Sequence, residues 1–398
     1  MSASHAVTVP TPKKYEWSSK AKSISLLLAA LGVATFIFTL KSDPQRAWAN
    51  FLTDYFFWLC IGLSGVFFTA LQHITGAYWS VTVRRISESF ISYLPVAAVL
   101  FVVLLFGIHH LYEWTHTDVV AHDEILKSKA GYLNPTFFMI RQFGLLAFVL
   151  ILGGWMVKNS LRQDSNGNVK LTELNTKISA PFLLFFAWLF TFGAFDLMMS
   201  LAPHWFSTIF GIYCWSGLFY SGLATITMIT IHLRKKGILS DFVTEHHLHD
   251  LGKLMFAFTV FWGYIAFSQY MLIWYANLPE ETPYMITRTM GAWKSISIAL
   301  AVGKFVIPFF LLIGKWAKKW QNYLYALTFW FLAAQWLDIY WMVFPTFYKT
   351  PIFGLTEVLM FFGFAGIFFF CVGNFLSKVT VVPIKDPRIE ECLAHHQF

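Results

Sequence analysis

Two aspartates mark this chain, because each lies near the end of a long apolar run. Asp196 and Asp338 are each followed seven residues later by a proline, where the apolar run breaks. A carboxyl group at that depth in hydrocarbon is costly, so it indicates a functional site or an ion pair. Arg141 and Arg288 lie near the starts of other apolar runs at comparable depth. We therefore expect Arg141 to pair with Asp196, and the second arginine to pair with the second aspartate.

Two interpretations of these pairs stay open. Each pair is either a structural tie between two helices, which an acid buried in a bundle needs, or a proton-accepting site tuned by the arginine and by burial. Because the pair is expected twice, the structural interpretation is favoured for any one of these residues. Both halves of the chain would need the same tie.

Lys304 has no counterpart in the first half of the chain. One alignment places it at the centre of the apolar run Ser295–Gly314, where an ammonium needs a partner acid or a water-filled cavity. Another alignment, made through Arg288, places it near the cytoplasmic boundary, where its side chain reaches water and has no function. Lys294 and Asp54, near the outer boundary, are weaker candidates. The predicted proton-path residues are Asp196, Arg141, Asp338, Arg288, Lys304, Gln269, Glu357 and His73.

The composition identifies the elements that must position these residues. Hydrophobic residues make up 57% of the 398 residues and charged residues only 13%, whereas soluble domains carry about 25% charged residues. The chain is therefore expected to be an all-α polytopic membrane protein. Apolar runs of about 20 residues, long enough to cross hydrocarbon, predict ten transmembrane helices. Their approximate limits are 23–40, 51–79, 90–112, 136–157, 178–199, 206–233, 251–275, 292–314, 323–344 and 354–376.

The distribution of lysine and arginine predicts the orientation. Of the 29 such residues, 19 lie in the two tails and in the loops after helices 2, 4, 6 and 8, whereas six lie in the other loops. Loops rich in Lys and Arg stay on the cytoplasmic side. Both termini are therefore expected to be cytoplasmic, with an N-terminal tail of residues 1–22 and a C-terminal tail of residues 377–398.

Three sets of matched residues predict an internal duplication. Leu63–Leu71 in helix 2 matches Trp215–Leu223 in helix 6 at an offset of 152 residues, and the surroundings of the two aspartates match at an offset of 142. The surroundings of the two arginines match at an offset of 147. Such repeats predict two parallel four-helix bundles. The predicted parts are helix 1 with its loop (23–50), the bundle of helices 2–5 (51–203), the bundle of helices 6–9 (204–350) and helix 10 (351–376).

The cysteines and histidines predict no bound cofactor or metal. The four cysteines stand singly, without the paired spacing of attached haem, iron–sulfur or zinc sites. His73 and His232 are the only histidines expected at one depth on different helices, and His232 lies at the water boundary, which disfavours b-type haem. The cluster Glu245–Asp250 resembles a metal site. Its place before helix 7 instead favours a solvated helix start with Asp250 as the cap.

Two stretches of the sequence resemble a known family. They are Phe195–Gly211, which contains a Pro-His-Trp corner, and His249–Phe258, which is followed by Tyr264 and Trp274–Glu281. Both are similar to the NrfD-like family of polysulfide-reductase-type membrane subunits, and most of all to the smaller NrfD-like subunit of bacterial alternative complex III. The resemblance implies ten helices and two four-helix bundles, in agreement with the predicted duplication.

The resemblance also implies a division of labour in a quinol oxidoreductase of the bacterial inner membrane. The implied partners are a larger NrfD-like subunit that binds menaquinol or ubiquinol, an iron–sulfur subunit, multihaem cytochrome c subunits and a terminal oxidase. Haem c and iron–sulfur clusters belong to those partners. This chain is expected to bind neither and to contribute polar residues to a proton path.

Three alternatives stay open. Parallel repeats with buried charge also occur in secondary transporters. The chain could instead bind quinol directly as a membrane anchor subunit, or could oxidise quinol alone with its own haem. Lipids are expected partners in every case, and no feature of the sequence indicates nucleic-acid binding.

Overall fold

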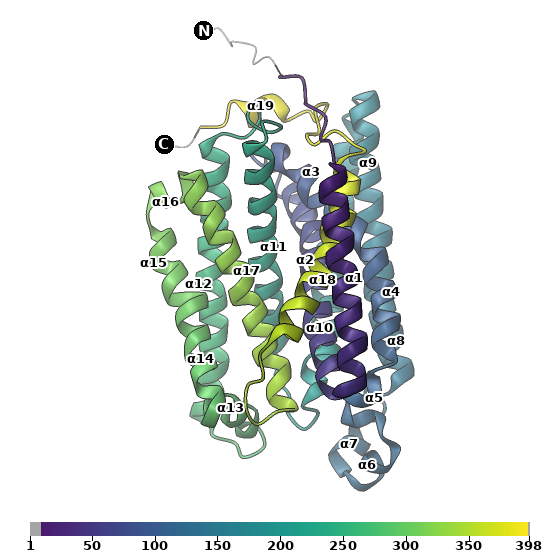
Figure 1. The fold of residues 1–398 in the computed structure, drawn as a ribbon. Coiled ribbons are helices and arrows are strands. Elements are labelled where there is room, and N and C mark those ends of the chain that lie inside the picture. Colours follow the sequence, from purple (N-terminus) through teal and green to yellow (C-terminus); the bar gives the residue numbers. More distant parts are fainter. Residues whose placement is uncertain (1–8, 397–398) are drawn as a thin grey trace.

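The computed structural model describes residues 9–396, which form helices packed side by side (Figure 1). Within these residues, ten helical segments are long and apolar enough to span a membrane. The predicted all-α polytopic fold is therefore confirmed. The spans are α1 (Ser19–Ser42), α2 (Pro44–Ile74), α3 with α4 (Val81–Leu105), α8 with α9 (Pro135–Asn166), α10 (Lys170–Leu197), α11 (Phe210–Lys235), α12 (Glu245–Ala276), α14 with α15 (Gly291–Ile313), α17 (Gln321–Val343) and α18 (Leu355–Leu376).

Two central helices organise the bundle. The most apolar windows of α2 and α11 are 94% and 89% buried, whereas that of α1 is only 17% buried. The core therefore runs along α2 and α11, and the other spans surround them. On the outside, α1 packs against α18, where a Cβ on Gly32 would lie 2.5 Å from the Cα of Gly363. The two backbones can approach this closely only because both residues lack a side chain.

The third span begins earlier than its hydropathy predicted. Its first helix, α3, starts at Val81 rather than near residue 90, so Arg84 and Arg85 are buried helical residues instead of loop residues. The polar first turns of α3 can be buried because Glu88, one turn later, accepts hydrogen bonds from the guanidinium groups of both Arg84 and Arg85. Window hydropathy counts such residues as loop, although their charges are satisfied within the fold.

Two spans contain a π-helical segment. These segments are Val149–Gly153, between α8 and α9, and Ala301–Val306, between α14 and α15. A π-turn inserts a residue into the α-helical ladder and re-aims neighbouring side chains, often at functional sites. The second segment carries Lys304, and the first carries no charged residue. The duplication of the chain itself stays a prediction.

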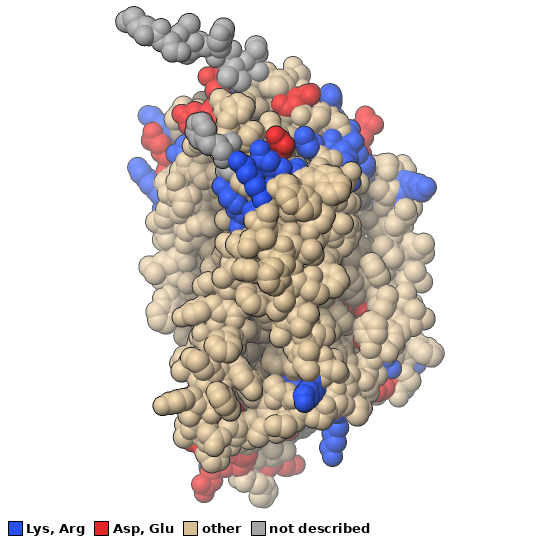
Figure 2. Space-filling view, turned by 90° about the vertical axis from the view of Figure 1, so that its left-hand side faces the viewer, with Lys and Arg blue, Asp and Glu red and all other residues tan. Residues whose placement is uncertain are grey.

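The two ends of the molecule differ in charge. Lys and Arg gather at the end where residues 9 and 396 lie, which we call the terminal end (Figure 2). The other end, here the loop end, carries the short helices α6 (Thr117–His122), α7 (Glu124–Lys129) and α13 (Thr282–Thr289) (Figure 1). The structure contains no membrane, so the assignment of the terminal end to the cytoplasm stays a prediction from the charge distribution.

The expected C-terminal tail is folded onto the terminal end. Residues 377–396 include the short helix α19 (Ile389–Leu393), and the side chains of Val381, Val382 and Cys392 are buried. Asp386 of this segment accepts a 2.5 Å hydrogen bond from Arg84. The segment is therefore part of the packed structure rather than a free tail.

Candidate functional site

A lysine and an aspartate form an ion pair inside the second half of the chain. The Nζ of Lys304 lies 2.5 Å from Oδ2 of Asp338, and both side chains are at most 1% exposed. The same ammonium donates to Oε1 of Gln335 at 2.5 Å. Asp338 also accepts from the Tyr213 hydroxyl and, at 3.2 Å, from the Trp262 indole. The carboxylate thus accepts three hydrogen bonds and the ammonium donates two, and these bonds replace part of the water that each charge would bind.

The backbone around Lys304 explains how a lysine reaches this position. Lys304 lies within the π-helical segment Ala301–Val306, near the middle of its span, and Pro308 follows one turn later. The structure therefore supports the deep placement of Lys304 over the boundary placement. The acid that this placement requires is Asp338. The Lys304 ammonium also lies over the rings of Trp262 and Tyr220, at 4.3 and 5.1 Å from their centroids.

Arg288 does not pair with Asp338, so that prediction is wrong. Its guanidinium donates to the backbone oxygens of Tyr284 and Met342 at 3.1 and 2.7 Å and lies 3.6 Å from the Tyr284 ring centroid. The physical reason is a break in the helix, because α13 ends at Thr289 and the next helical segment begins only at Gly291. Arg288 is therefore held outside the span, where burial lowers its pKa from the ordinary value.

The first half contains the predicted pair of Arg141 and Asp196. Two parallel hydrogen bonds of 2.7 Å join the guanidinium to the carboxylate, and Gln142 adds a third at 3.1 Å. The rings of Tyr132 and Phe137 lie 3.8 and 4.2 Å from the guanidinium carbon. A charge held by a bidentate bond and by two rings is a rigid clamp between α8 and α10.

Glu357 lies in a second polar group near the loop end. Its carboxylate accepts two hydrogen bonds from Arg46, at 2.8 and 2.7 Å, and one from Asn50 at 3.0 Å. It also accepts from the backbone amide of Gly354 at 2.7 Å, which caps α18. One helical turn deeper on α2, Asp54 accepts from the Trp336 indole at 2.8 Å. Sequence reasoning gave Asp54 little weight.

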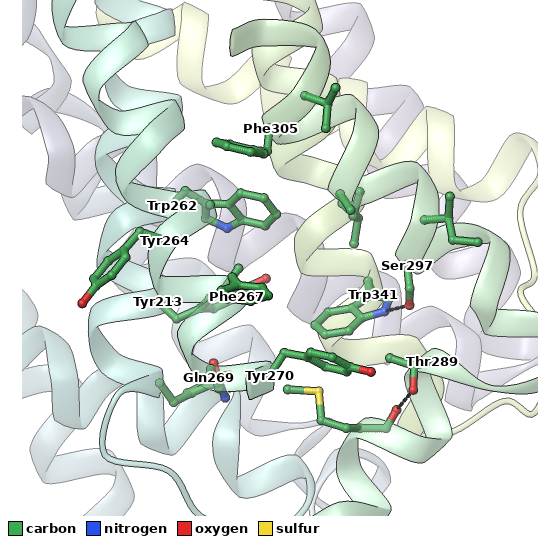
Figure 3. A pocket seen from close by; sticks show the side chains of 18 of the residues that line it. Tyr213, Trp262, Tyr264, Phe267, Gln269, Tyr270, Thr289, Ser297, Phe305 and Trp341 are labelled. Carbon is green, nitrogen blue, oxygen red and sulfur yellow. Dashed lines mark hydrogen bonds between the residues drawn. The ribbon is translucent and has the colours of Figure 1, made fainter. Parts of the chain in front are cut away.

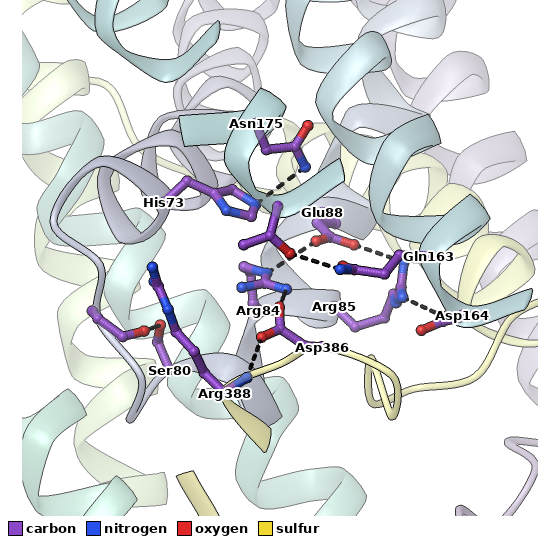
Figure 4. Close-up of polar contacts among 12 residues, drawn as sticks. His73, Ser80, Arg84, Arg85, Glu88, Gln163, Asp164, Asn175, Asp386 and Arg388 are labelled. Carbon is purple, nitrogen blue, oxygen red and sulfur yellow. Dashed lines mark hydrogen bonds and ion pairs between the residues drawn. The ribbon is translucent and has the colours of Figure 1, made fainter. Parts of the chain in front are cut away.

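A charged network that sequence reasoning missed lies at the terminal end (Figure 4). Arg84 pairs with Asp386 and Arg85 pairs with Asp164, each at 2.5 Å, and Glu88 bridges the two arginines. The spacing of Arg84 and Glu88, four residues apart, is the sequence signal that could have indicated a helix here. Both acids outside α3 come from distant segments, which the sequence alone does not bring together.

His73 lies beside this network in the last turn of α2, where its side chain is buried (Figure 4). Its Nε2 lies 3.4 Å from the amide nitrogen of Asn175, and its Nδ1 has no hydrogen-bond partner among the described residues. His73 is thus placed between the terminal end and the central core. The predicted candidates therefore do not form one cluster, but are spread over eight helical segments from the loop end to the terminal end.

An apolar pocket opens beside the Lys304–Asp338 pair (Figure 3). Its volume is about 700 Å³, and it lies between α12 and the span of α14 and α15. Tyr213 and Trp262, which donate hydrogen bonds to Asp338, also line the pocket. Gln269 lines it too and is only 4% exposed, and its side chain makes no hydrogen bond to another described residue.

The histidine cluster before α12 forms a helix start, but not in the predicted way. Thr244 is the cap, and His247 accepts from its backbone amide at 3.1 Å. Asp250 lies inside the helix instead and pairs with Lys253 and His395, each at 2.7 Å, so its predicted capping role is wrong. Residues 9–396 contain no group of three or more His, Cys, Asp or Glu side chains arranged to hold a metal ion.

Comparison of the chain with models of known protein families and with curated protein sequences finds no match. The site must therefore be interpreted from its own geometry. That geometry is a buried ion pair beside an apolar pocket. The polar group of Glu357 lies toward the loop end, and the charged network of Arg84 lies at the terminal end.

Proposed function

We propose that this chain is an integral membrane subunit of a respiratory quinol oxidoreductase of the alternative complex III type, and that it carries protons for that complex. It would lie in the bacterial inner membrane with both termini in the cytoplasm. The resemblance of Phe195–Gly211 and His249–Phe258 to the NrfD-like family supports the assignment. The excess of Lys and Arg at the terminal end supports the orientation.

The observation that carries the proposal is the Lys304–Asp338 pair. A buried ion pair gives little or no net stability relative to apolar side chains of the same volume, because both charges lose their hydration. Ionisable residues inside a membrane mark ion or proton pathways by default. Lysine can release its proton and aspartate can accept one, so this pair can change its protonation state when a proton arrives. The pair therefore suits a proton-carrying site.

The proposed complex assigns electron transfer to other subunits. A larger NrfD-like subunit would bind menaquinol or ubiquinol, and an iron–sulfur subunit and multihaem cytochrome c subunits would receive the electrons. A terminal oxidase would be the final acceptor. This chain would pair with the larger membrane subunit and provide a path for protons across the bilayer.

The experiment measures proton translocation and quinol oxidation separately in the intact complex. We expect Lys304→Met and Asp338→Asn each to reduce proton release and membrane potential while quinol oxidation by the partner subunit continues. Lys158→Met is the control, since Lys158 is exposed on α9 and does not line the pocket. Unchanged proton release in both Lys304 and Asp338 variants would remove the proton-carrying role. Unchanged proton release in Asp196→Asn would show that the Arg141–Asp196 pair is structural.

A second candidate function is direct quinol binding by this chain. The pocket beside Tyr213 and Trp262 favours it, because an apolar cavity with a few polar groups is the usual form of a ligand site. A photoreactive quinone should then label residues that line the pocket, and Gln269→Leu should reduce the labelling. A transporter is distinguished from both candidates by purification, because a transporter should be isolated without haem-containing partner subunits.

A further inference from the structure

Asp54 is a buried carboxyl group without a cation beside it. Its side chain is 0% exposed, and its one hydrogen bond within residues 9–396 comes from the Trp336 indole, which donates to Oδ1 at 2.8 Å. Its Oδ2 is buried and has no partner there. The other buried acids described above each have a Lys, Arg or His partner, so Asp54 differs from all of them.

The protein surroundings of Asp54 favour its neutral form. Moving an ionised carboxylate out of water into an apolar interior costs several kcal/mol, and often far more, unless a cation or several donors compensate. One indole donor does not replace the hydration of a full negative charge. A protonated carboxyl group avoids this cost and can also donate a hydrogen bond through its own hydroxyl.

Unsatisfied polar atoms gather around Asp54. All of these atoms are buried and have no hydrogen-bond partner among the described residues. They belong to residues on neighbouring turns of α2 or close to α2. They are Oδ1 of Asn50, Oδ2 of Asp54, the hydroxyl of Tyr55, Nε1 of Trp58 and the hydroxyl of Tyr93. Each such atom costs about 1–3 kcal/mol if it stays unpaired. Buried polar groups of this kind are normally satisfied by ordered water.

Asp54 and its donor Trp336 each lie close in sequence to residues of a site that already carries charge. Asn50 and Arg46, one and two turns toward the loop end on α2, both donate to Glu357. On the other side, Trp336 lies on α17 between Gln335 and Asp338, the two residues that accept from Lys304. Asp54 lies about 15 Å from the first residue of α2, at about 1.5 Å per helical residue. It is therefore placed between the loop end and the middle of the bundle.

We propose that Asp54 is a protonated relay in a hydrated path that joins the Arg46–Glu357 group to the Lys304–Asp338 pair. A proton that arrives from one side is taken up by one carboxyl oxygen, while the proton on the other oxygen leaves through ordered water toward the opposite side. The carboxyl group returns to its starting form and no electrons move. The use of the path rests on the proposed function, whereas the protonation of Asp54 does not.

The first test is infrared spectroscopy of the purified complex at neutral pH. We expect a carbonyl band of a protonated carboxylic acid that shifts in deuterated water, is lost in Asp54→Asn and is retained in Asp338→Asn. If Asp54→Asn leaves all protonated-carboxyl bands in place, Asp54 is ionised and the proposal is overturned. Asn has nearly the same volume as Asp and can still accept from Trp336, so the variant should keep the fold. Thermal denaturation compared with the wild type verifies this.

The second test compares proton translocation in two variants of the same complex. We expect Asp54→Asn to slow proton release on the order of tenfold or more, as expected for removal of a proton-transfer group, and Asp54→Glu to restore it in part. Wild-type proton release in Asp54→Asn, together with a loss in Lys304→Met, would overturn the relay and leave the proposed function intact. Wild-type release in both variants would overturn the proposed function as well. A loss in Asp54→Asn that Asp54→Glu does not restore at all would assign Asp54 a structural role.

Discussion

Removal of Lys304 alone should destabilise the protein more than removal of the whole ion pair. At an Nζ–Oδ2 distance of 2.5 Å and an effective dielectric constant of about 20, the attraction between the two charges is about 7 kcal/mol. Desolvation of both groups offsets most of it. A partner left behind keeps its desolvation cost without the attraction, so Lys304→Met should lower the free energy of unfolding by about 3–5 kcal/mol.

The double variant tests where this cost comes from. In Lys304→Met with Asp338→Asn, no charge is left. The single Asn oxygen can still accept from either the Tyr213 hydroxyl or the Trp262 indole, which bond different oxygens of Asp338. We expect a loss of only about 1–2 kcal/mol, which is about 2–3 kcal/mol less than the loss for Lys304→Met alone. The measurement is reversible unfolding of the purified protein in mixed detergent. Lys294→Met, at an exposed lysine of the same span, should change stability by less than about 0.5 kcal/mol.

Two results would contradict this reasoning. A loss below about 1 kcal/mol for Lys304→Met would mean that Asp338 is not left as an unpaired charge. Additive losses in the double variant would mean that the two side chains do not interact in the folded protein, contrary to the 2.5 Å contact.

Three further predictions concern other parts of the fold. Asp386→Asn leaves the buried Arg84 with a weaker acceptor, so unfolding should require about 2–4 kcal/mol less free energy and proteolysis of residues 377–396 should become faster. Gly32→Val places side-chain atoms in the space of the α18 backbone, so cysteine crosslinking between α1 and α18 should fall sharply relative to the wild type. Hydrogen bonds from the backbone amide of Leu126 and from His204 lower the pKa of Asp123. A lowered pKa contributes stability that is present above the unfolded value of about 3.9 and is lost as the pH falls further. Exchange protection of the Leu126 amide should therefore fall in strongly acidic solution and should be absent at all pH values in Asp123→Ala.

The sequence predicted those features that depend on local composition or on a contact between two adjacent spans. Ten spans could be predicted because each needs only a long apolar run, and the limits of five of them lie within four residues of the observed ones at both ends. The Arg141–Asp196 pair could be predicted because both residues lie near the same ends of adjacent spans, where an acid in hydrocarbon needs a cation. Neither prediction required knowledge of how distant helices pack.

The predictions that failed depended on where a helix begins or on contacts between distant segments. Arg288 occupies the sequence position that matches Arg141, but the non-helical residue after Thr289 holds it outside the span. Arg84 was expected in a loop because window hydropathy cannot show that Asp386, 302 residues later, pairs with it. The role of Asp54 was underestimated for the same reason, since its contact with Trp336 joins residues 282 positions apart.

The two buried acid–base pairs are chemically different, and this difference separates the structural interpretation from the functional one. Arg141 stays charged at every physiological pH and is fixed by two hydrogen bonds and two aromatic rings, so it can hold Asp196 but cannot carry a proton. Lys304 has an ammonium that can lose a proton, and its partner Asp338 also accepts from a tyrosine hydroxyl. The first pair therefore suits a permanent tie between helices. The lysine also lies in a π-helical segment next to a ligand-sized pocket, so the second pair combines burial, exchangeable protons and a neighbouring cavity.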